Sequence, residues 1–185
     1  MAKEKTTWHP EFTPSHTPEE MLRLGVFEGK YINLVKGVPA SWKKLPKVVG
    51  PGAEPDVDLN KYKVKSRQPL SEWKRKGWIK TDAGGWFHWY CLYYLGRRLG
   101  EEDEWQIKRW RSFVARHMGG VKSKCGLKDD SCNPRQRQGL LQWAWDSHTE
   151  FTEAQQTKNL KRIASSAGVQ VLTVSQESLP PSAEW

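Results

Sequence analysis

Apolar residues recur at helical spacing in several segments of the chain, and polar capping residues precede most of these segments. Near the N-terminus, Thr17 and Glu20 have the spacing of a capping box, and Pro18 suits the first helical position. We therefore predict a helix over residues 18–28 that ends at Gly29. Its apolar side needs another surface to pack against.

Two helices with stronger signals are predicted in the middle of the chain. Acidic residues begin the first, over residues 101–118, where the helix dipole favours negative charge, and a pair of glycines follows it. Asn133 and Pro134 supply the cap and first position of the second, and helical apolar spacing continues to His148. The inward stripe predicted for the first of these helices consists of Ile107, Trp110, Val114 and Met118.

An aromatic run covers residues 86–99. Periodicity alone does not separate a buried strand from a helix in such a run, but its length and the helical offsets of its rings favour a helix. The rings are interpreted either as the core of a small domain or as a platform for stacking, and their spacing favours the core. The rings at helical offsets are Trp86, Trp89, Tyr90 and Tyr93.

Composition divides the chain into three parts. Residues 1–65 form a proline-rich N-terminal arm, residues 66–149 a basic, aromatic-rich helical core, and residues 150–185 a C-terminal helix and flexible tail. The last helix is predicted over residues 153–167, after a second capping box. The expected fold class is mainly α: a compact three-helix core domain with an extended N-terminal arm and a C-terminal helix plus tail.

Positive charge and large rings concentrate in the same part of the chain. Residues 61–149 carry 19 Lys and Arg against 9 Asp and Glu, and eight of the 11 tryptophans. Cations neutralise phosphates and release counterions, while flat rings stack on bases. This pattern predicts a nucleic-acid-binding protein that contacts the phosphate backbone of DNA or RNA and needs no cofactor. Both termini are further candidates for contact with a protein partner.

The composition and hydropathy of the chain also exclude other classes of protein. The chain has no apolar stretch of about 18 residues, so we expect no transmembrane helix and no membrane partner. Its first residues lack the apolar part of a secretory signal, and its three cysteines fit a reducing compartment. An intracellular location is therefore expected, in the cytoplasm, the nucleus or nucleoid, or a host cell if the protein is viral.

The first turn of the second predicted helix is the strongest candidate site. Arg135 and Arg137 lie there, where the helix dipole disfavours cations, and a bound anion would offset that cost. We predict that they form a phosphate clamp, with Gln138 adding hydrogen bonds. The alternative is a local structural network in which both arginines pair with Asp129 and Asp130.

Two further basic groups extend the predicted surface. In one, three cations stand between two tryptophans in a predicted turn, which suits stacking beside phosphate contacts. The alternative is a solvated turn whose tryptophans point into the core. In the other, two arginines close the aromatic run and a third lies on the helix over residues 101–118; an ordinary solvated face is the alternative. These candidates are Lys74, Arg75, Lys76, Trp73, Trp78, Arg97, Arg98 and Arg109.

Metal binding and catalysis have little support in the sequence. His117, Cys125 and Cys132 are weak candidates for zinc ligands, and their spacing matches no usual zinc motif. Asp146, beside two tryptophans, is a carboxylate that an apolar setting would perturb, but no matched second group accompanies it. We therefore predict no catalytic residue. Two other classes stay open: a structural or assembly protein, such as a virion component, and an enzyme acting on nucleobases or nucleotides.

Four segments carry unusual combined motifs: MLRLGVFEGKY at residues 21–31, LSEWKRKGW at 70–78, GWFHWYC at 85–91 with Tyr94 and GRR at 96–98, and PRQRQGLLQW at 134–143. Together they resemble a family of small, basic, tryptophan-rich proteins from viral, bacterial and some eukaryotic genomes. The similarity covers about residues 17–148. The resemblance implies no activity, cofactor or catalytic residue, because none is known for the family.

Overall fold

The computed structural model describes residues 6–172, which fold mainly into α-helices, as the sequence predicts. The α-helices are α1 (Pro18–Leu24), α2 (Leu70–Arg75), α3 (Gly85–Tyr94), α4 (Glu101–Lys124), α5 (Pro134–Gln142) and α6 (Glu153–Ala167). Short 3-10 helices lie between α1 and α2: η1 (Phe27–Gly29), η2 (Tyr31–Leu34), η3 (Ala40–Lys44) and η4 (Val57–Leu59). Two-residue strands, β1 (Thr7–Trp8) and β2 (Gln170–Val171), pair in parallel. Within this range, no helix combines the length and apolar character needed to cross a bilayer.

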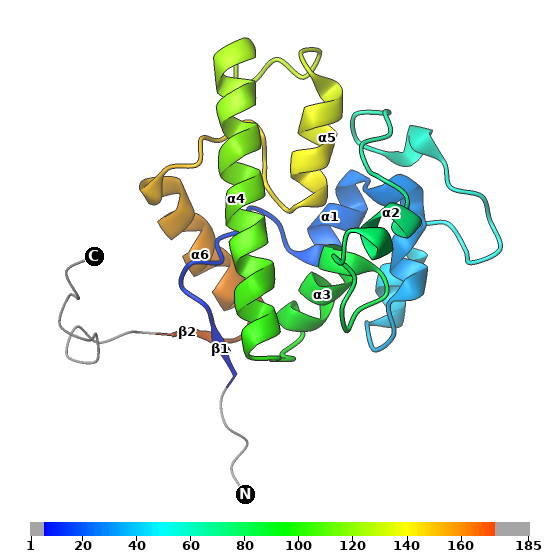
Figure 1. The fold of residues 1–185 in the computed structure, drawn as a ribbon, viewed down its shortest axis with the longest axis horizontal. Helices are drawn as coiled ribbons and strands as arrows, with labels where there is room; N and C mark the ends of the chain where they lie inside the picture. Colours follow the sequence, from blue (N-terminus) through cyan, green and yellow to red (C-terminus); the bar gives the residue numbers. More distant parts are fainter. Residues whose placement is uncertain (1–5, 173–185) are drawn as a thin grey trace, which may run out of the picture.

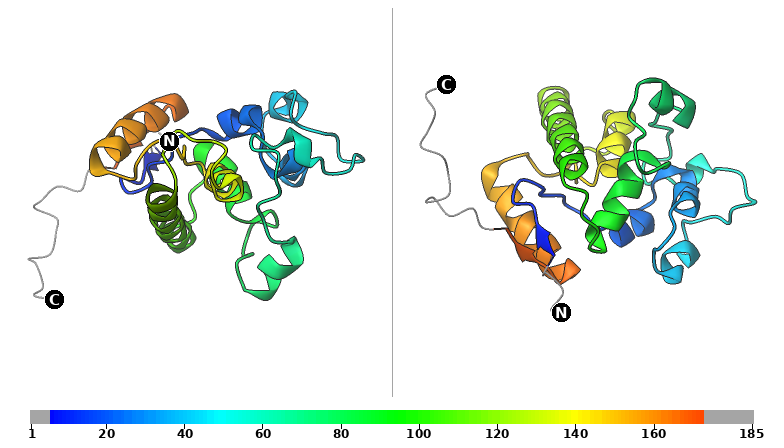
Figure 2. Two further views of the ribbon diagram at one scale, coloured as in Figure 1. Left: turned by 90° about the horizontal axis from the view of Figure 1, so that it is seen from above. Right: turned by 60° about the horizontal axis from the view of Figure 1, so that its bottom comes forward.

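The long helix α4 lies at the centre of the arrangement (Figure 1). Helix α6 and the β1–β2 pair lie on one side of it, and α5, α1 and α2 lie on the other. The two further views agree that α6 and α2 lie at opposite ends of the molecule (Figure 2). A ligand that contacts α2 therefore meets the end of the protein that is remote from α6.

Aromatic rings build the centre of the core. Phe12, which follows β1, is fully buried, and its ring centroid lies 5.1 Å from those of Tyr90 and Trp110 in edge-to-face geometry. Trp8 stacks on Phe12 from the other side, with centroids 5.5 Å apart. Such ring pairs contribute about 0.5 to 1.5 kcal/mol each beyond their buried area. The aromatic run is helix α3, and most of its rings are buried in this core.

All three sequence segments contribute to one hydrophobic core. Trp8 and Phe12 come from the segment predicted as an arm, and Ile163 and Ala164 come from α6. They pack in the same cluster as the buried residues of α3, α4 and α5. The core therefore extends well beyond the three helices that composition suggested.

Capping residues define two helices as predicted. Thr17 Oγ1 accepts a hydrogen bond from Glu20 N, and Glu20 Oε1 accepts one from Thr17 N, both at 3.1 Å, which completes the capping box of α1. At α6, Thr152 Oγ1 accepts from Gln155 N at 3.2 Å, but the side chain of Gln155 donates to Asn159 Oδ1, so the predicted capping box forms only in part. Gly168 adopts a φ of 70° and ends α6 where the sequence indicates.

Two glycines act differently from the prediction. Helix α1 ends at Leu24 instead of residue 28, because Gly25 takes a φ of 107° and a Cβ there would lie 2.1 Å from the carbonyl oxygen of Leu59. Helix α4, by contrast, continues past Gly120 to Lys124. A Cβ at Gly120 would lie 2.8 Å from Gln136 Nε2, so this glycine allows α5 to pack closely against α4.

Helix α5 is shorter than predicted. It ends at Gln142, six residues before the predicted end at His148, because the amide of Trp143 closes the last turn and Ala144 adopts a left-handed φ of 60°. The chain then turns so that Trp145 enters the core while Trp143 stays half-buried. Helical spacing alone could not show this change of direction.

Candidate functional site

A pocket of about 610 Å³ lies among α2, α3, α4 and α5. This volume is within the range of about 300 to 1,000 Å³ that is typical of small-molecule sites. Its wall combines large rings with cations. The ring residues are Phe27, Trp73, Trp78, Trp86, Phe87, Trp105, Phe113 and Trp143. The basic residues are Arg67, Lys108, Arg109, Arg116 and Arg135, together with His117.

The tryptophans of the described residues separate into a core set and a pocket set. Those that are buried away from the pocket are Trp8, Trp42, Trp89, Trp110 and Trp145. Four are only half-buried, and all four line the pocket: Trp73, Trp78, Trp105 and Trp143. Concentration of partly exposed large rings in one concavity is typical of a binding site, whereas scattered ones need no explanation.

One face of α4 forms a wall of the pocket. The residues of this face recur at offsets of three and four along the chain, the spacing that places side chains on one side of a helix. The opposite face carries Ile107, Trp110 and Val114 into the core, as predicted. Helix α4 therefore has two functional sides, one for packing and one for the pocket. The pocket side consists of Trp105, Lys108, Arg109, Ser112, Phe113, Arg116 and His117.

Arg109 lies among three tryptophan rings on this wall. Its guanidinium carbon is 4.5 Å from the ring centroid of Trp105 and 5.5 Å from those of Trp78 and Trp143. Burial lowers the pKa of Arg109 to about 10, and no carboxylate counteracts this effect. The rings attract the cation without neutralising its charge. An anionic ligand would supply the missing negative charge.

The guanidinium of Arg109 also has unused hydrogen-bonding capacity. Its Nη1 donates to Gln106 Oε1 at 2.7 Å, and this is its one side-chain hydrogen bond to the described residues. A guanidinium has five N–H donors in a planar fork, a geometry that matches carboxylate and phosphate oxygens. Arg109 is therefore equipped to bind such a group from the pocket.

The pocket is electropositive. No carboxylate lines it within residues 6–172. Arg67 has an acidic partner outside the lining, because its Nη2 donates to Glu28 Oε2 at 2.7 Å. The four other cations of the lining make no ion pair with the described residues. Clefts lined by charge of one sign focus the electric field and attract ligands of the opposite charge.

Two buried donors of the pocket residues lack a partner among the described residues. They are Trp86 Nε1 and Arg67 Nε. Trp86 is 4% exposed, and its ring stacks on Trp143 with centroids 5.0 Å apart. A buried donor without an acceptor costs about 1 to 3 kcal/mol. Neither nitrogen is exposed to the pocket, so these donors belong to its wall and are not contacts for a ligand.

Hydrogen bonds from two side-chain amides determine which ring nitrogen of His117 carries the proton. Asn133 Nδ2 donates to Gln136 Oε1 at 2.7 Å, so the amide nitrogen of Gln136 faces His117 Nδ1 at 2.9 Å. Since that nitrogen donates, Nδ1 accepts, and the proton of the neutral ring lies on Nε2. Burial, followed by the charge of Arg116, lowers the pKa of His117, so the ring is neutral at pH 7. His117 thus has an Nε2–H donor and no basic nitrogen available for catalysis.

The two arginines predicted to form a clamp do not converge. Arg135 is exposed and lines the pocket, whereas Arg137 is fully buried, because two residues along a helix point in nearly opposite directions. The guanidinium of Arg137 is bonded to neutral acceptors within the protein and does not line the pocket. It donates at 2.7 to 3.0 Å to the carbonyl oxygens of Gly126, Leu127 and Cys132 and to Ser147 Oγ.

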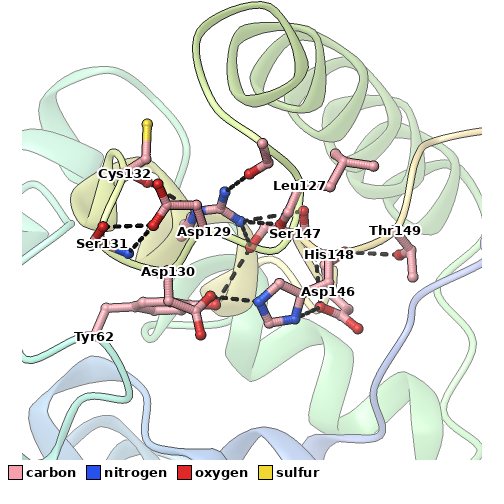
Figure 3. Close-up of polar contacts among 12 residues, drawn as sticks. Tyr62, Leu127, Asp129, Asp130, Ser131, Cys132, Asp146, Ser147, His148 and Thr149 are labelled. Atoms are coloured by element: carbon pink, nitrogen blue, oxygen red, sulfur yellow. Dashed lines mark hydrogen bonds and ion pairs between the residues drawn. The ribbon is translucent and has the colours of Figure 1, made fainter.

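Neither Gln138 nor the two nearby aspartates act as predicted. Gln138 is fully buried; its Oε1 accepts from Tyr62 N at 3.0 Å, and its Nε2 donates to backbone and side-chain oxygens. Asp129 accepts from Ser131. Asp130 instead contacts His148, which lies between Asp130 and Asp146 (Figure 3). The local network of arginines with these aspartates therefore does not form.

Arg97 and Arg98 form hydrogen bonds with other parts of the protein. Arg97 donates to both carboxylate oxygens of the buried Asp82. Arg98 donates to the carbonyl oxygens of Thr7 and Tyr93, and its guanidinium carbon lies 3.5 Å from the centroid of the Tyr93 ring. Neither arginine lines the pocket, so the predicted continuous stripe from these residues to Arg109 is not formed.

The basic cluster on α2 lies beside the pocket residues Trp73 and Trp78. Its three cations are exposed and do not line the pocket. Arg75 pairs with Glu72 at 2.8 Å, and Lys76 Nζ lies 4.7 Å from the centroid of the Trp78 ring. Lys74 makes no side-chain contact of this kind with the described residues. The cluster therefore extends the positive charge of this region beyond the pocket wall.

The three weak zinc candidates do not form one metal-binding group among the described residues. Cys125 and Cys132 form a disulfide with a Cα–Cα distance of 5.8 Å, and His117 contacts Gln136. Asp146 pairs with His148 Nδ1 at 3.1 Å and is absent from the pocket lining, so the perturbed carboxylate considered in the sequence does not face the tryptophans of the pocket.

Sequence reasoning did not assign several pocket residues to the site. The spacing of Trp105, Lys108 and Arg109 gave a usable signal. It places the three side chains on one side of a helix predicted from the sequence, apart from the apolar stripe of that helix. Arg67 and Trp143 gave no such signal, since their position depends on how distant segments pack.

Comparison with family models, curated proteins and solved structures found no match for the chain.

Proposed function

We propose that this protein binds nucleic acid, and that its pocket contacts both phosphate groups and bases. The observation that carries this proposal is the shared location of two kinds of residue. All four half-buried tryptophans of the described chain line one concavity, together with four cations that lack an acidic partner. Cations attract phosphate regardless of sequence, and aromatic rings stack on bases.

The proposed roles follow from position in the pocket. Lys108, Arg109 and Arg116 of α4, and Arg135 of α5, contact phosphate oxygens. Trp73, Trp78 and Trp105 provide stacking surfaces, whereas the ring of Trp143 is already stacked on Trp86 and Phe113. The exposed cations of α2 add long-range attraction. Arg97, Arg98, Arg137 and Gln138 are left out of the proposed surface, because they do not line the pocket and their side chains bond to groups within the protein.

The two other functional classes receive less support. An enzyme acting on nucleobases would need a group that moves protons, and the pocket offers a neutral His117 whose Nδ1 is already occupied. An assembly protein would need an apolar face, whereas the exposed rings here stand beside unpaired cations. The charge of the pocket therefore favours a polyanionic ligand over both.

The proposal predicts how the salt dependence of binding changes in a double variant of the pocket and in a control double variant. For a single strand, log Kobs falls with log salt at about −0.7 per phosphate contacted. The double variant Arg116→Gln/Arg135→Gln removes two proposed contacts, so we expect the slope to flatten by about 1.4 and binding to weaken on all sequences alike. Fluorescence anisotropy of labelled single-stranded DNA and RNA at several salt concentrations measures this slope.

A matched control uses two exposed lysines of α6, at the end of the molecule opposite α2 (Figure 2). Lys158→Gln/Lys161→Gln lowers the net charge by the same amount, and its slope should equal that of the wild type. An equal flattening in both double variants would contradict the assigned site. Absence of binding by the wild-type protein at about 150 mM salt would contradict the function itself.

A further inference from the structure

We infer that the pocket takes a single unpaired nucleotide, with its base among the tryptophan rings and its phosphate on Arg109. This inference rests on the proposed function, because it names the unit of nucleic acid that the pocket recognises. That unit is a nucleoside phosphate, which is either a free nucleotide or one residue of a single strand.

The location of the rings excludes recognition of paired bases. The half-buried tryptophans line a concavity and do not project from the protein surface. In a duplex, both faces of each base are covered by its neighbours, so a base reaches such rings only after it leaves the stack. The pocket volume of about 610 Å³ suits a small molecule and does not admit a double helix.

The position of Arg109 fixes where the phosphate would bind. Three tryptophan rings hold its guanidinium, which restricts its rotation before any ligand arrives. Its free N–H donors lie beside Arg116 and Lys108 on the same helix face and across from Arg135 of α5. Positively charged groups from two helices therefore line the pocket into which Arg109 can donate to an anion.

The rings indicate why the ligand carries a base. Trp73, Trp78 and Trp105 are half-buried and line the same pocket as Arg109. A nucleobase has two flat faces that stack on such rings. Ring stacking distinguishes a nucleotide from a simple anion, which would engage Arg109 alone.

A competition assay tests the inference. A fluorescent single-stranded oligonucleotide is bound to the full chain, and the competitors are nucleoside monophosphates, the corresponding nucleosides, inorganic phosphate, an unlabelled single strand and a duplex. We expect monophosphates to displace the probe, nucleosides and phosphate to be at least about tenfold weaker, and the single strand to exceed the duplex by a similar factor.

Two variants add a second readout. Trp105→Leu removes one ring and Arg109→Gln removes the proposed phosphate contact, and each should weaken the monophosphate about tenfold or more, while Lys158→Gln leaves it unchanged. Because a misfolded variant would also fail, the circular dichroism spectrum of each is compared with the wild type. A folded Arg109→Gln that binds monophosphate as well as the wild type overturns the inference.

The outcomes separate the inference from the proposed function. If the oligonucleotide binds but monophosphates do not compete and the duplex binds as tightly as the single strand, the inference is wrong and the function stands. If monophosphates bind and no polynucleotide does, the pocket takes a free nucleotide and nucleic-acid binding is wrong. If neither binds, both are wrong.

Discussion

Replacement of Arg137 by methionine is expected to lower the free energy of unfolding by about 3 to 5 kcal/mol, because a buried network of four hydrogen bonds to a charged donor is lost at once. The side chain is fully buried and donates to three backbone carbonyls and a serine hydroxyl. Methionine fills much of the space but leaves those oxygens without a donor, at about 1 to 3 kcal/mol for each buried group. Denaturant titration followed by tryptophan fluorescence measures the change.

The arrangement of the acceptors of Arg137 suits a guanidinium group. Gly126, Leu127 and Cys132 belong to the loop that the disulfide closes, and Ser147 lies beyond α5. One planar guanidinium therefore joins two separate loops to α5. Lysine, which presents a single ammonium, does not reproduce the fork, so Arg137→Lys should recover only part of the lost stability.

Arg135→Met supplies the matched control. This residue is two positions earlier on α5, exposed, and free of ion pairs with the described residues. Its loss should change stability by no more than about 0.5 kcal/mol, as is usual for surface positions. Equal destabilisation by the two variants would contradict the division of these arginines into one structural and one surface group.

Replacement of Arg109 by glutamine is expected to weaken binding of single-stranded nucleic acid by about 10- to 100-fold, the equivalent of one charge-assisted bidentate contact. The same variant should change the free energy of unfolding by less than about 1 kcal/mol. Loss of the contacts with the tryptophan rings destabilises the protein, but removal of a cation whose pKa burial lowers to about 10 stabilises it, so the two effects offset each other.

Arg109→Lys refines this prediction. Lysine keeps the charge but loses the planar fork, so binding should lie between that of the wild type and that of Arg109→Gln. Anisotropy titrations at one salt concentration rank the three proteins. If Arg109→Gln binds as tightly as the wild type while its stability falls by several kcal/mol, Arg109 is a structural residue and the proposed site is wrong.

Much of the helical framework could be predicted because its signals are local. Thr17, Thr152 and Gly168 act on hydrogen bonds within one or two turns of themselves, and their helix ends are as expected. The effects of Gly25 and Gly120 on their helices could not be predicted from local sequence, since they depend on Leu59 and Gln136, which are distant in sequence. Whether a glycine ends a helix or allows a close approach is decided by the tertiary partner.

The site was predictable only in part, for a similar reason. Arg109, Arg135, Trp73 and Trp78 were singled out from charge and ring content, and all four line the pocket. Arg137 has the same local sequence signal as Arg135, and only the carbonyl groups of the loop before α5 and the hydroxyl group of Ser147 distinguish them. A buried arginine with neutral acceptors has no counter-charge in the sequence that would reveal it.

Indole N–H resonances of the ¹⁵N-labelled protein, followed during titration with a short single-stranded oligonucleotide, test whether the pocket is the binding site. Trp8, Trp89 and Trp145 donate to internal oxygens and serve as references. Signals of the pocket tryptophans, with Trp86 among them, should shift in proportion to occupancy while the references stay in place. If the oligonucleotide binds and the pocket signals do not move, the nucleic acid binds elsewhere and the proposed site is wrong.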